Sequence, residues 1–121
     1  MGLTTATTAS EVVNHHLVAF NEADMPELLK DYDDSSTVLA PIGEFNGLAQ
    51  IEGFFTEVFK MLPKGSTKLE IDKKVVKDNL VYLSWHAESP YVSIPAAADT
   101  FIVKNEKIVV QAIGAHIIPK N

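Results

Sequence analysis

The sequence predicts an α+β domain in which three N-terminal helices cover a cone-shaped, curved antiparallel sheet. In the first half of the chain, apolar residues recur at the spacing of amphipathic helices. In the second half, apolar and polar residues alternate with period two, and short turn sequences separate the alternating segments. Helices followed by an antiparallel meander are typical of the α+β class. A chain of 121 residues with 46% hydrophobic residues suits one such domain with a sizeable core.

The first helix is predicted from Ser10 to about Ala23. Its apolar stripe is formed by Val13, Leu17 and Phe20, which recur at intervals of three and four residues. Ser10 is the expected N-cap, because a serine hydroxyl can accept a hydrogen bond from a free backbone N–H of the first turn.

Two further helices follow. The second begins after Asp24, a good capping residue, and Pro26 is tolerated in a first turn because that turn needs no N–H donor. The third covers residues 48–62, where aromatic and aliphatic residues share one face and Pro63 and Gly65 end the pattern.

The strands are predicted from alternation and from the turns between them. Thr37–Ala40 is a short strand that Pro41 and Gly43 interrupt. The pairs Asp78-Asn79 and Asn105-Glu106 mark two tight turns. The long strands of the meander are residues 68–72, 80–88, 92–104 and 108–118.

Composition limits the functional classes. The net charge of −6 argues against nucleic acid as a partner, which would need a basic surface. The absence of cysteine excludes disulfides and zinc–thiolate sites. We expect residues 1–9 to be a flexible lead and residues 10–121 to be the single domain. No run of about 18 apolar residues and no export signal are present, so we expect no membrane contact and a cytoplasmic location.

Two adjacent histidines in the first helix must point in different directions. The neighbours of His16 at helical spacing are apolar, whereas His15 shares its face with Glu11 and Glu22. We therefore expect His15 to be solvated and His16 to point inward. Two interpretations of His16 remain open: a core histidine satisfied by one hydrogen bond, or a polar group that projects into a ligand pocket and can exchange a proton.

Asp99 is the second candidate. It has the strand parity of Phe101 and Val103, so its carboxyl group is expected to face the apolar interior. Burial would raise its pKa and favour the neutral, proton-donating form. The alternative is an exposed carboxylate near a turn.

No cofactor or metal is expected. The four histidines do not have the spacing of a metal site, and no glycine-rich phosphate loop or nucleophile elbow is present.

Two stretches resemble the nuclear transport factor 2-like superfamily, which holds ketosteroid isomerases and SnoaL-like cyclases. They are AFNEADMPELLKDYDDSSTVLAPIGEFNGLAQIEGFF (residues 19–55) and DTFIVKNEKIVVQAI (residues 99–113), and the similarity extends from about residue 11 to residue 117. The resemblance implies the cone-shaped fold. It says little about function, because this fold hosts enzymes and binding proteins alike.

The comparison with ketosteroid isomerases gives each candidate a possible role. His16 falls where the family has a tyrosine that donates a hydrogen bond to the substrate oxygen, and Asp99 matches the second, protonated donor. Tyr32 matches a supporting tyrosine, and Phe55 falls where another would be. The family's general base is an aspartate before a proline, and here that position is Ala40. Alanine cannot take a proton, so the family's isomerisation is not expected unless His16 itself acts as the base.

Three functions are therefore compared: a protein that binds a small apolar molecule, an enzyme of isomerase, cyclase or hydrolase type on such a molecule, and a structural domain. We rank binding first and leave catalysis unresolved. We expect a homodimer through the open sheet face. The residues expected at the site are His16 and Asp99 as catalytic groups, with ligand contacts from Tyr32, Val38, Ala40, Phe55, Trp85, Phe101 and Gln111.

Overall fold

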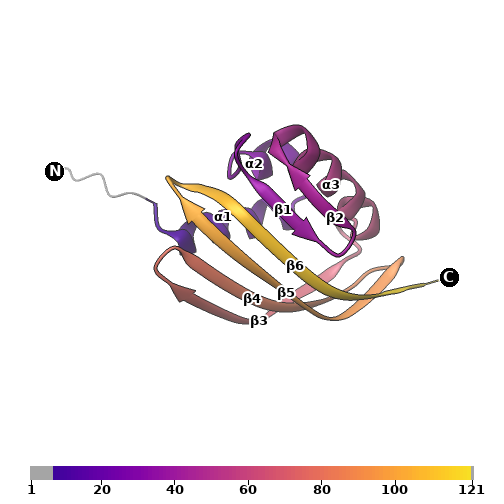
Figure 1. Ribbon diagram of the computed structural model, residues 1–121. Helices are drawn as coiled ribbons and strands as arrows, with labels where there is room; N and C mark the ends of the chain where they lie inside the picture. Colours follow the sequence, from indigo (N-terminus) through magenta and orange to yellow (C-terminus); the bar gives the residue numbers. More distant parts are fainter. Residues whose placement is uncertain (1–6, 121) are drawn as a thin grey trace.

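The computed structural model describes residues 7–120, which form three helices and one six-stranded sheet (Figure 1). The helices are α1 (Ala9–Asn21), α2 (Met25–Leu29) and α3 (Gly47–Met61). The strands are β1 (Thr37–Ala40), β2 (Gly43–Asn46), β3 (Lys68–Lys77), β4 (Leu80–Glu88), β5 (Val92–Lys104) and β6 (Lys107–Pro119). The predicted α+β architecture is confirmed.

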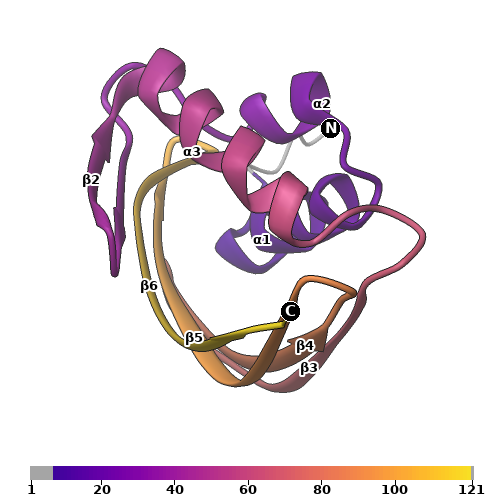
Figure 2. The same ribbon diagram turned by 90° about the vertical axis from the view of Figure 1, so that its right-hand side faces the viewer.

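The sheet has the strand order β2-β1-β6-β5-β4-β3 and is strongly curved. Figure 2 shows the three helices on the concave side, with the four long strands bending beneath them. The pairing is antiparallel except between β1 and β6, which run parallel, so the sheet is mixed. The register shifts within β3–β4, β4–β5 and β5–β6 are irregularities of the kind that bend strands.

The start of α1 differs from the prediction. The N-cap is Thr8 rather than Ser10: its hydroxyl accepts a hydrogen bond from the Glu11 backbone N–H at 3.1 Å. The Glu11 carboxylate accepts in turn from the Thr8 backbone N–H at 2.9 Å. This reciprocal capping box satisfies two free donors, whereas a serine cap alone satisfies one. The predicted cap of α2 is confirmed, because Asp24 accepts from the Glu27 backbone N–H.

The predicted strands and turns of the meander agree with β3 to β6, although β3 extends to Lys77. Asn105 and Glu106 both have positive φ, as a tight two-residue hairpin turn requires. The prediction missed β2, which pairs with β1 in a hairpin. Three of its four residues are exposed, so no alternation marks it in the sequence.

The core lies between the helices and the concave face of the sheet. The largest fully buried side chains include Tyr32, Phe55 and Phe101, which come from the α2–β1 connection, α3 and β5. In β5, Asp99, Phe101 and Val103 are buried while Thr100 is exposed, which confirms the predicted strand parity.

The expected lead, residues 1–9, lies partly outside the described residues, which begin at residue 7; Thr8 and Ala9 already form the cap and first turn of α1. Across residues 7–120, no helix has the length and apolar character needed to cross a lipid bilayer. The cytoplasmic location stays a prediction.

Candidate functional site

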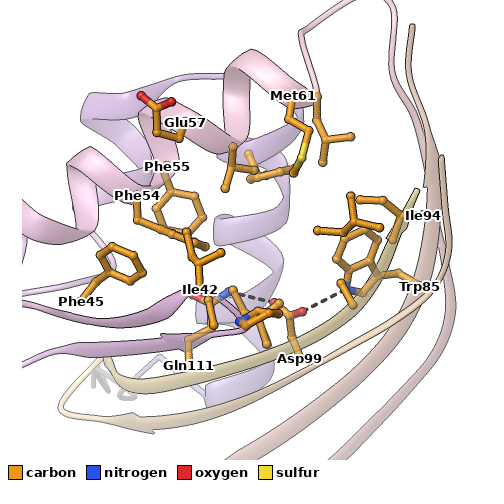
Figure 3. Close-up of a pocket in the computed structure, with 18 of the residues that line it drawn as sticks. Ile42, Phe45, Phe54, Phe55, Glu57, Met61, Trp85, Ile94, Asp99 and Gln111 are labelled. Carbon is orange, nitrogen blue, oxygen red and sulfur yellow. Dashed lines mark hydrogen bonds between the residues drawn. The ribbon is translucent and has the colours of Figure 1, made fainter. Parts of the chain in front are cut away.

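A cavity of about 570 Å³ lies between the helices and the concave face of the sheet. Its walls come from α1, the β1–β2 hairpin, α3 and the four long strands. Figure 3 shows Trp85, Asp99 and Gln111 together on the sheet, with side chains of α3 on the opposite wall. The volume falls within the range of small-molecule sites, roughly 300–1,000 Å³.

Most of the lining is aliphatic or aromatic. The apolar residues that contribute are Leu17, Phe20, Ala40, Pro41, Ile42, Phe45, Phe54, Phe55, Val58, Met61, Leu62, Leu69, Ile71, Leu83, Trp85, Ile94, Ile113, Ala115 and Ile117. Polar atoms are contributed by His16, Asp99 and Gln111 in the interior, and by Glu44, Gln50 and Glu57, which are exposed. An apolar cavity with a few interior polar groups is the usual form of a small-molecule site.

His16 points inward, as predicted, and 3% of its surface is exposed. Its ring packs against Phe55 and Phe101, with centroids 5.9 and 5.4 Å away. This apolar surrounding disfavours the imidazolium, so burial lowers the pKa of His16 to about 3. The ring is neutral at physiological pH.

A chain of hydrogen bonds connects His16 to Asp99. The Nδ1 atom of His16 lies 3.2 Å from the Tyr32 hydroxyl, which donates to the Gln111 side-chain carbonyl. The Gln111 amide then donates to Oδ2 of Asp99 at 2.8 Å. The two predicted catalytic groups are therefore joined through Tyr32 and Gln111 rather than by direct contact.

Asp99 is held by two donors. The Trp85 indole N–H donates to its Oδ1 atom at 2.9 Å, and the Gln111 amide donates to Oδ2 (Figure 3). Both bonds favour the carboxylate, but desolvation by burial outweighs them, and the pKa of Asp99 is raised from its ordinary value. This direction agrees with the prediction.

The structure separates the predicted ligand contacts into two groups. Ala40, Phe55, Trp85 and Gln111 line the cavity, as do His16 and Asp99. Three others lie in the core behind the wall, with at most 2% of their surface exposed: Tyr32, Val38 and Phe101. Tyr32 contacts the lining through hydrogen bonds with His16 and Gln111, and Phe101 packs against the His16 ring.

Ala40 stands at the cavity wall, at the end of β1. The position that the resemblance assigns to a general base therefore faces the interior, and it carries a methyl group. Proton abstraction from this position is excluded. A lone pair for such a role is available on the neutral His16 ring.

His15 differs from the prediction. It lies between Asp31, 2.7 Å from Nδ1, and Glu27, 2.9 Å from Nε2, rather than with Glu11 and Glu22. Its side chain is 36% exposed, so it is half-buried at the α1–α2 contact rather than solvated. Glu11 caps its own helix, and Glu22 pairs with Lys64.

Beyond Ala40, sequence reasoning missed the contribution of the β1–β2 hairpin to the cavity. Ile42 and Phe45 line it, and Phe45 packs on Phe54 with ring centroids 4.8 Å apart. A signal was available in the two apolar residues that flank Gly43-Glu44. Within residues 7–120, no group of three or more His, Asp or Glu side chains is arranged to hold a metal ion.

The family profile of the SnoaL-like domain matches residues 13–111. The chain belongs to this family. That stretch includes His16, Asp99 and Gln111. The predicted membership of the nuclear transport factor 2-like superfamily is thereby confirmed. No curated protein matches the sequence.

Solved structures of SnoaL-like and related proteins share the fold at low identity. A nuclear transport factor 2-like protein of unknown function from Cytophaga hutchinsonii is 17% identical, with TM-score 0.76 and coverage of 94% of this chain and 95% of that one. A candidate polyketide cyclase from Sinorhizobium meliloti is 15% identical, with TM-score 0.74 and coverage of 85% and 93%. TerC, co-crystallised with polyporic acid, is 14% identical, with TM-score 0.74 and coverage of 89% and 91%.

Proposed function

We propose that this SnoaL-like protein binds a small, mostly apolar molecule in its cavity. The observation that supports the proposal is the combination of about 570 Å³ of space, an apolar lining and three buried polar groups, His16, Asp99 and Gln111. TerC offers a parallel, because this protein of similar fold was crystallised with a small molecule.

A fluorescent probe tests this proposal. 1-Aminoanthracene, which is neutral and apolar, should gain fluorescence on titration with the protein. Ala115→Trp places a large ring in the cavity, because Ala115 lines it. Val18→Trp introduces the same side chain on α1, where Val18 is 65% exposed. We expect binding to weaken at least about ten-fold in the first variant and to be unchanged in the second. Absence of binding, or equal loss in both variants, would contradict the proposal.

Catalysis is the second candidate function. It is favoured by the shifted pKa values of two groups at one cavity, a histidine held neutral and an aspartate whose proton affinity is raised. Such a pair could move a proton within an isomerase, cyclase or hydrolase reaction. The Sinorhizobium protein with a similar fold is named as a polyketide cyclase, which agrees with this class. Ala40 argues against the ketosteroid isomerase mechanism.

Substitutions separate binding from catalysis. Turnover of aromatic polyketide substrates would be followed by chromatography in the wild type, His16→Phe and Asp99→Asn. Product formed by the wild type and lost in both variants, with probe affinity within about three-fold, would indicate an enzyme. Binding without product in all three proteins would support the binding function and contradict catalysis.

We also propose a homodimer through the outer face of the sheet. Register places Leu39, Ala112, Thr100, Tyr82 and Val75 in one row across five strands. Three of these side chains are large, apolar and exposed: Leu39 at 43%, Tyr82 at 42% and Val75 at 47%. A row of this kind fits a self-complementary two-fold interface.

Sedimentation tests the dimer. Tyr82→Glu should convert a dimer into a monomer, because the interface would then have to bury a carboxylate among apolar side chains. Tyr91→Glu is the control: Tyr91 is 58% exposed and precedes β5 rather than lying in the row. A wild-type monomer at about 50 μM would refute this interface.

A further inference from the structure

The hydrogen-bond chain beside the cavity has a fixed direction. The Gln111 side-chain carbonyl can only accept a hydrogen bond, so the Tyr32 hydroxyl must donate its single proton to it. The same hydroxyl can then only accept from His16 Nδ1. His16 must therefore carry a proton on Nδ1.

The protonation state of the other ring nitrogen, Nε2, follows from this assignment. Burial lowers the pKa of His16 to about 3, so the ring holds one proton, and Nε2 carries a lone pair. The structure gives the His16 ring one hydrogen bond, at Nδ1, and among the described residues no fully buried side-chain nitrogen or oxygen lacks a partner. Since His16 lines the cavity, Nε2 is the atom at its surface.

Two of the nearby donors are already used within the protein. The Tyr32 hydroxyl donates a hydrogen bond to Gln111, and the indole N–H of Trp85 donates one to Asp99. This part of the cavity therefore offers the ligand an acceptor, His16 Nε2. A ligand carbonyl oxygen would place its lone pair against that of Nε2, whereas a ligand hydroxyl group would donate a hydrogen bond to it.

The charges of the lining bear on the ligand as well. Asp99, Glu44 and Glu57 line the cavity, and no lysine does so among the described residues. Glu57 has its own counterion, Lys60, at 3.0 Å. A ligand carboxylate in the interior would be desolvated without a cation to pair with it.

We propose that the cavity selects a neutral ligand whose hydroxyl group donates a hydrogen bond to Nε2 of His16. This inference rests on the proposed binding function and specifies its ligand. Tyr32 and Gln111 are positioning residues, because their hydrogen bonds hold the His16 tautomer that accepts from the ligand.

Three probes of nearly the same shape test the inference by isothermal titration calorimetry at neutral pH. 2-Naphthol carries the hydroxyl donor, 2-methoxynaphthalene lacks it, and 2-naphthoate carries a negative charge. We expect 2-naphthol to bind about three- to ten-fold more tightly than the methoxy compound, the worth of one hydrogen bond. We expect 2-naphthoate to bind the least tightly of the three.

Two variants connect this preference to His16. His16→Phe keeps an aromatic ring without an acceptor, so the two neutral probes should bind it within about two-fold of each other. Tyr32→Phe removes the acceptor of the Nδ1 proton and should reduce the preference. Nitrogen-15 NMR of the histidine rings should show the Nδ1–H tautomer of His16 in the wild type and a shift towards Nε2–H in Tyr32→Phe, which loss of packing alone would not produce.

The outcomes separate the inference from the function on which it rests. Equal binding of the two neutral probes to the wild type, tight binding of 2-naphthoate, or an Nε2–H tautomer would overturn the inference while cavity binding stands. Failure of all three probes to bind would overturn both. A preference for 2-naphthol that survives in His16→Phe would assign the hydroxyl contact to another group and also overturn the inference.

Discussion

His15 and His16 are adjacent on α1 and have opposite environments. His16 is buried among aromatic rings, and burial lowers its pKa to about 3. His15 is partly exposed between Asp31 and Glu27, and hydrogen bonds to these two carboxylates raise its pKa. One peptide bond thus separates a neutral ring that faces a cavity from a ring whose pKa is raised by two carboxylates at the contact between α1 and α2. The comparison shows that charge state is decided by the surrounding face of the helix and not by residue type.

Placing a permanent charge at each position should give the largest contrast. His16→Lys buries an ammonium group without a carboxylate in contact, and we expect it to lower the free energy of unfolding by roughly 3–5 kcal/mol. His15→Lys keeps a cation beside Asp31 and Glu27, so its effect should be within about 0.5 kcal/mol. Urea denaturation at neutral pH measures both. Comparable losses in the two variants would remove the distinction between the two sites.

Acid should destabilise the protein through His16. Its folded pKa, about 3, lies below the unfolded value of 6.5, so its stabilisation is complete above about pH 6.5 and is lost as the pH falls towards 3. Relative to His16→Phe, the wild type should lose roughly 3 kcal/mol between about pH 6.5 and pH 4. Parallel stability curves for the two proteins over this range would show that His16 titrates normally.

Removing the hydroxyl of Tyr32 should have an intermediate effect. Tyr32→Phe leaves the Nδ1 proton of His16 and the Gln111 carbonyl without their partner, and we expect a loss of about 1–3 kcal/mol. Tyr82→Phe is the matched control, because Tyr82 is 42% exposed on the outer sheet face. Denaturation midpoints should fall in the first variant only. An unchanged midpoint for Tyr32→Phe would mean that the chain contributes nothing to stability.

The smallest effect should come from His15. Its folded pKa is raised, so its stabilisation is complete below the unfolded value of 6.5 and is lost as the pH rises through the folded value. Because the side chain is partly exposed, we expect the wild type to exceed His15→Gln by less than about 1 kcal/mol near pH 6, with the difference shrinking by about pH 9. A difference that grows with pH would have the wrong sign for a protonated histidine between carboxylates.

The directions of His16 and Asp99 could be read from local sequence, because a helix repeats every 3.6 residues and a strand every two. The partner of His15 could not be predicted in this way. Helix periodicity placed His15 with Glu11 and Glu22, whereas its partner Asp31 follows α2 in the chain. Strand β2 was missed for a related reason, since a mostly exposed segment has no hydrophobic alternation to reveal it.

The sequence by itself determined the α+β class, the helices, the long strands and the inward direction of one histidine and one aspartate, because these depend on patterns within a few turns or strand residues. Only the tertiary structure decided how those two groups are connected. Tyr32 and Gln111 are 79 positions apart in the sequence, and their hydrogen bond exists because the sheet curves beneath the helices. That bond fixes the proton on His16, and with it the kind of ligand atom that the cavity is proposed to accept.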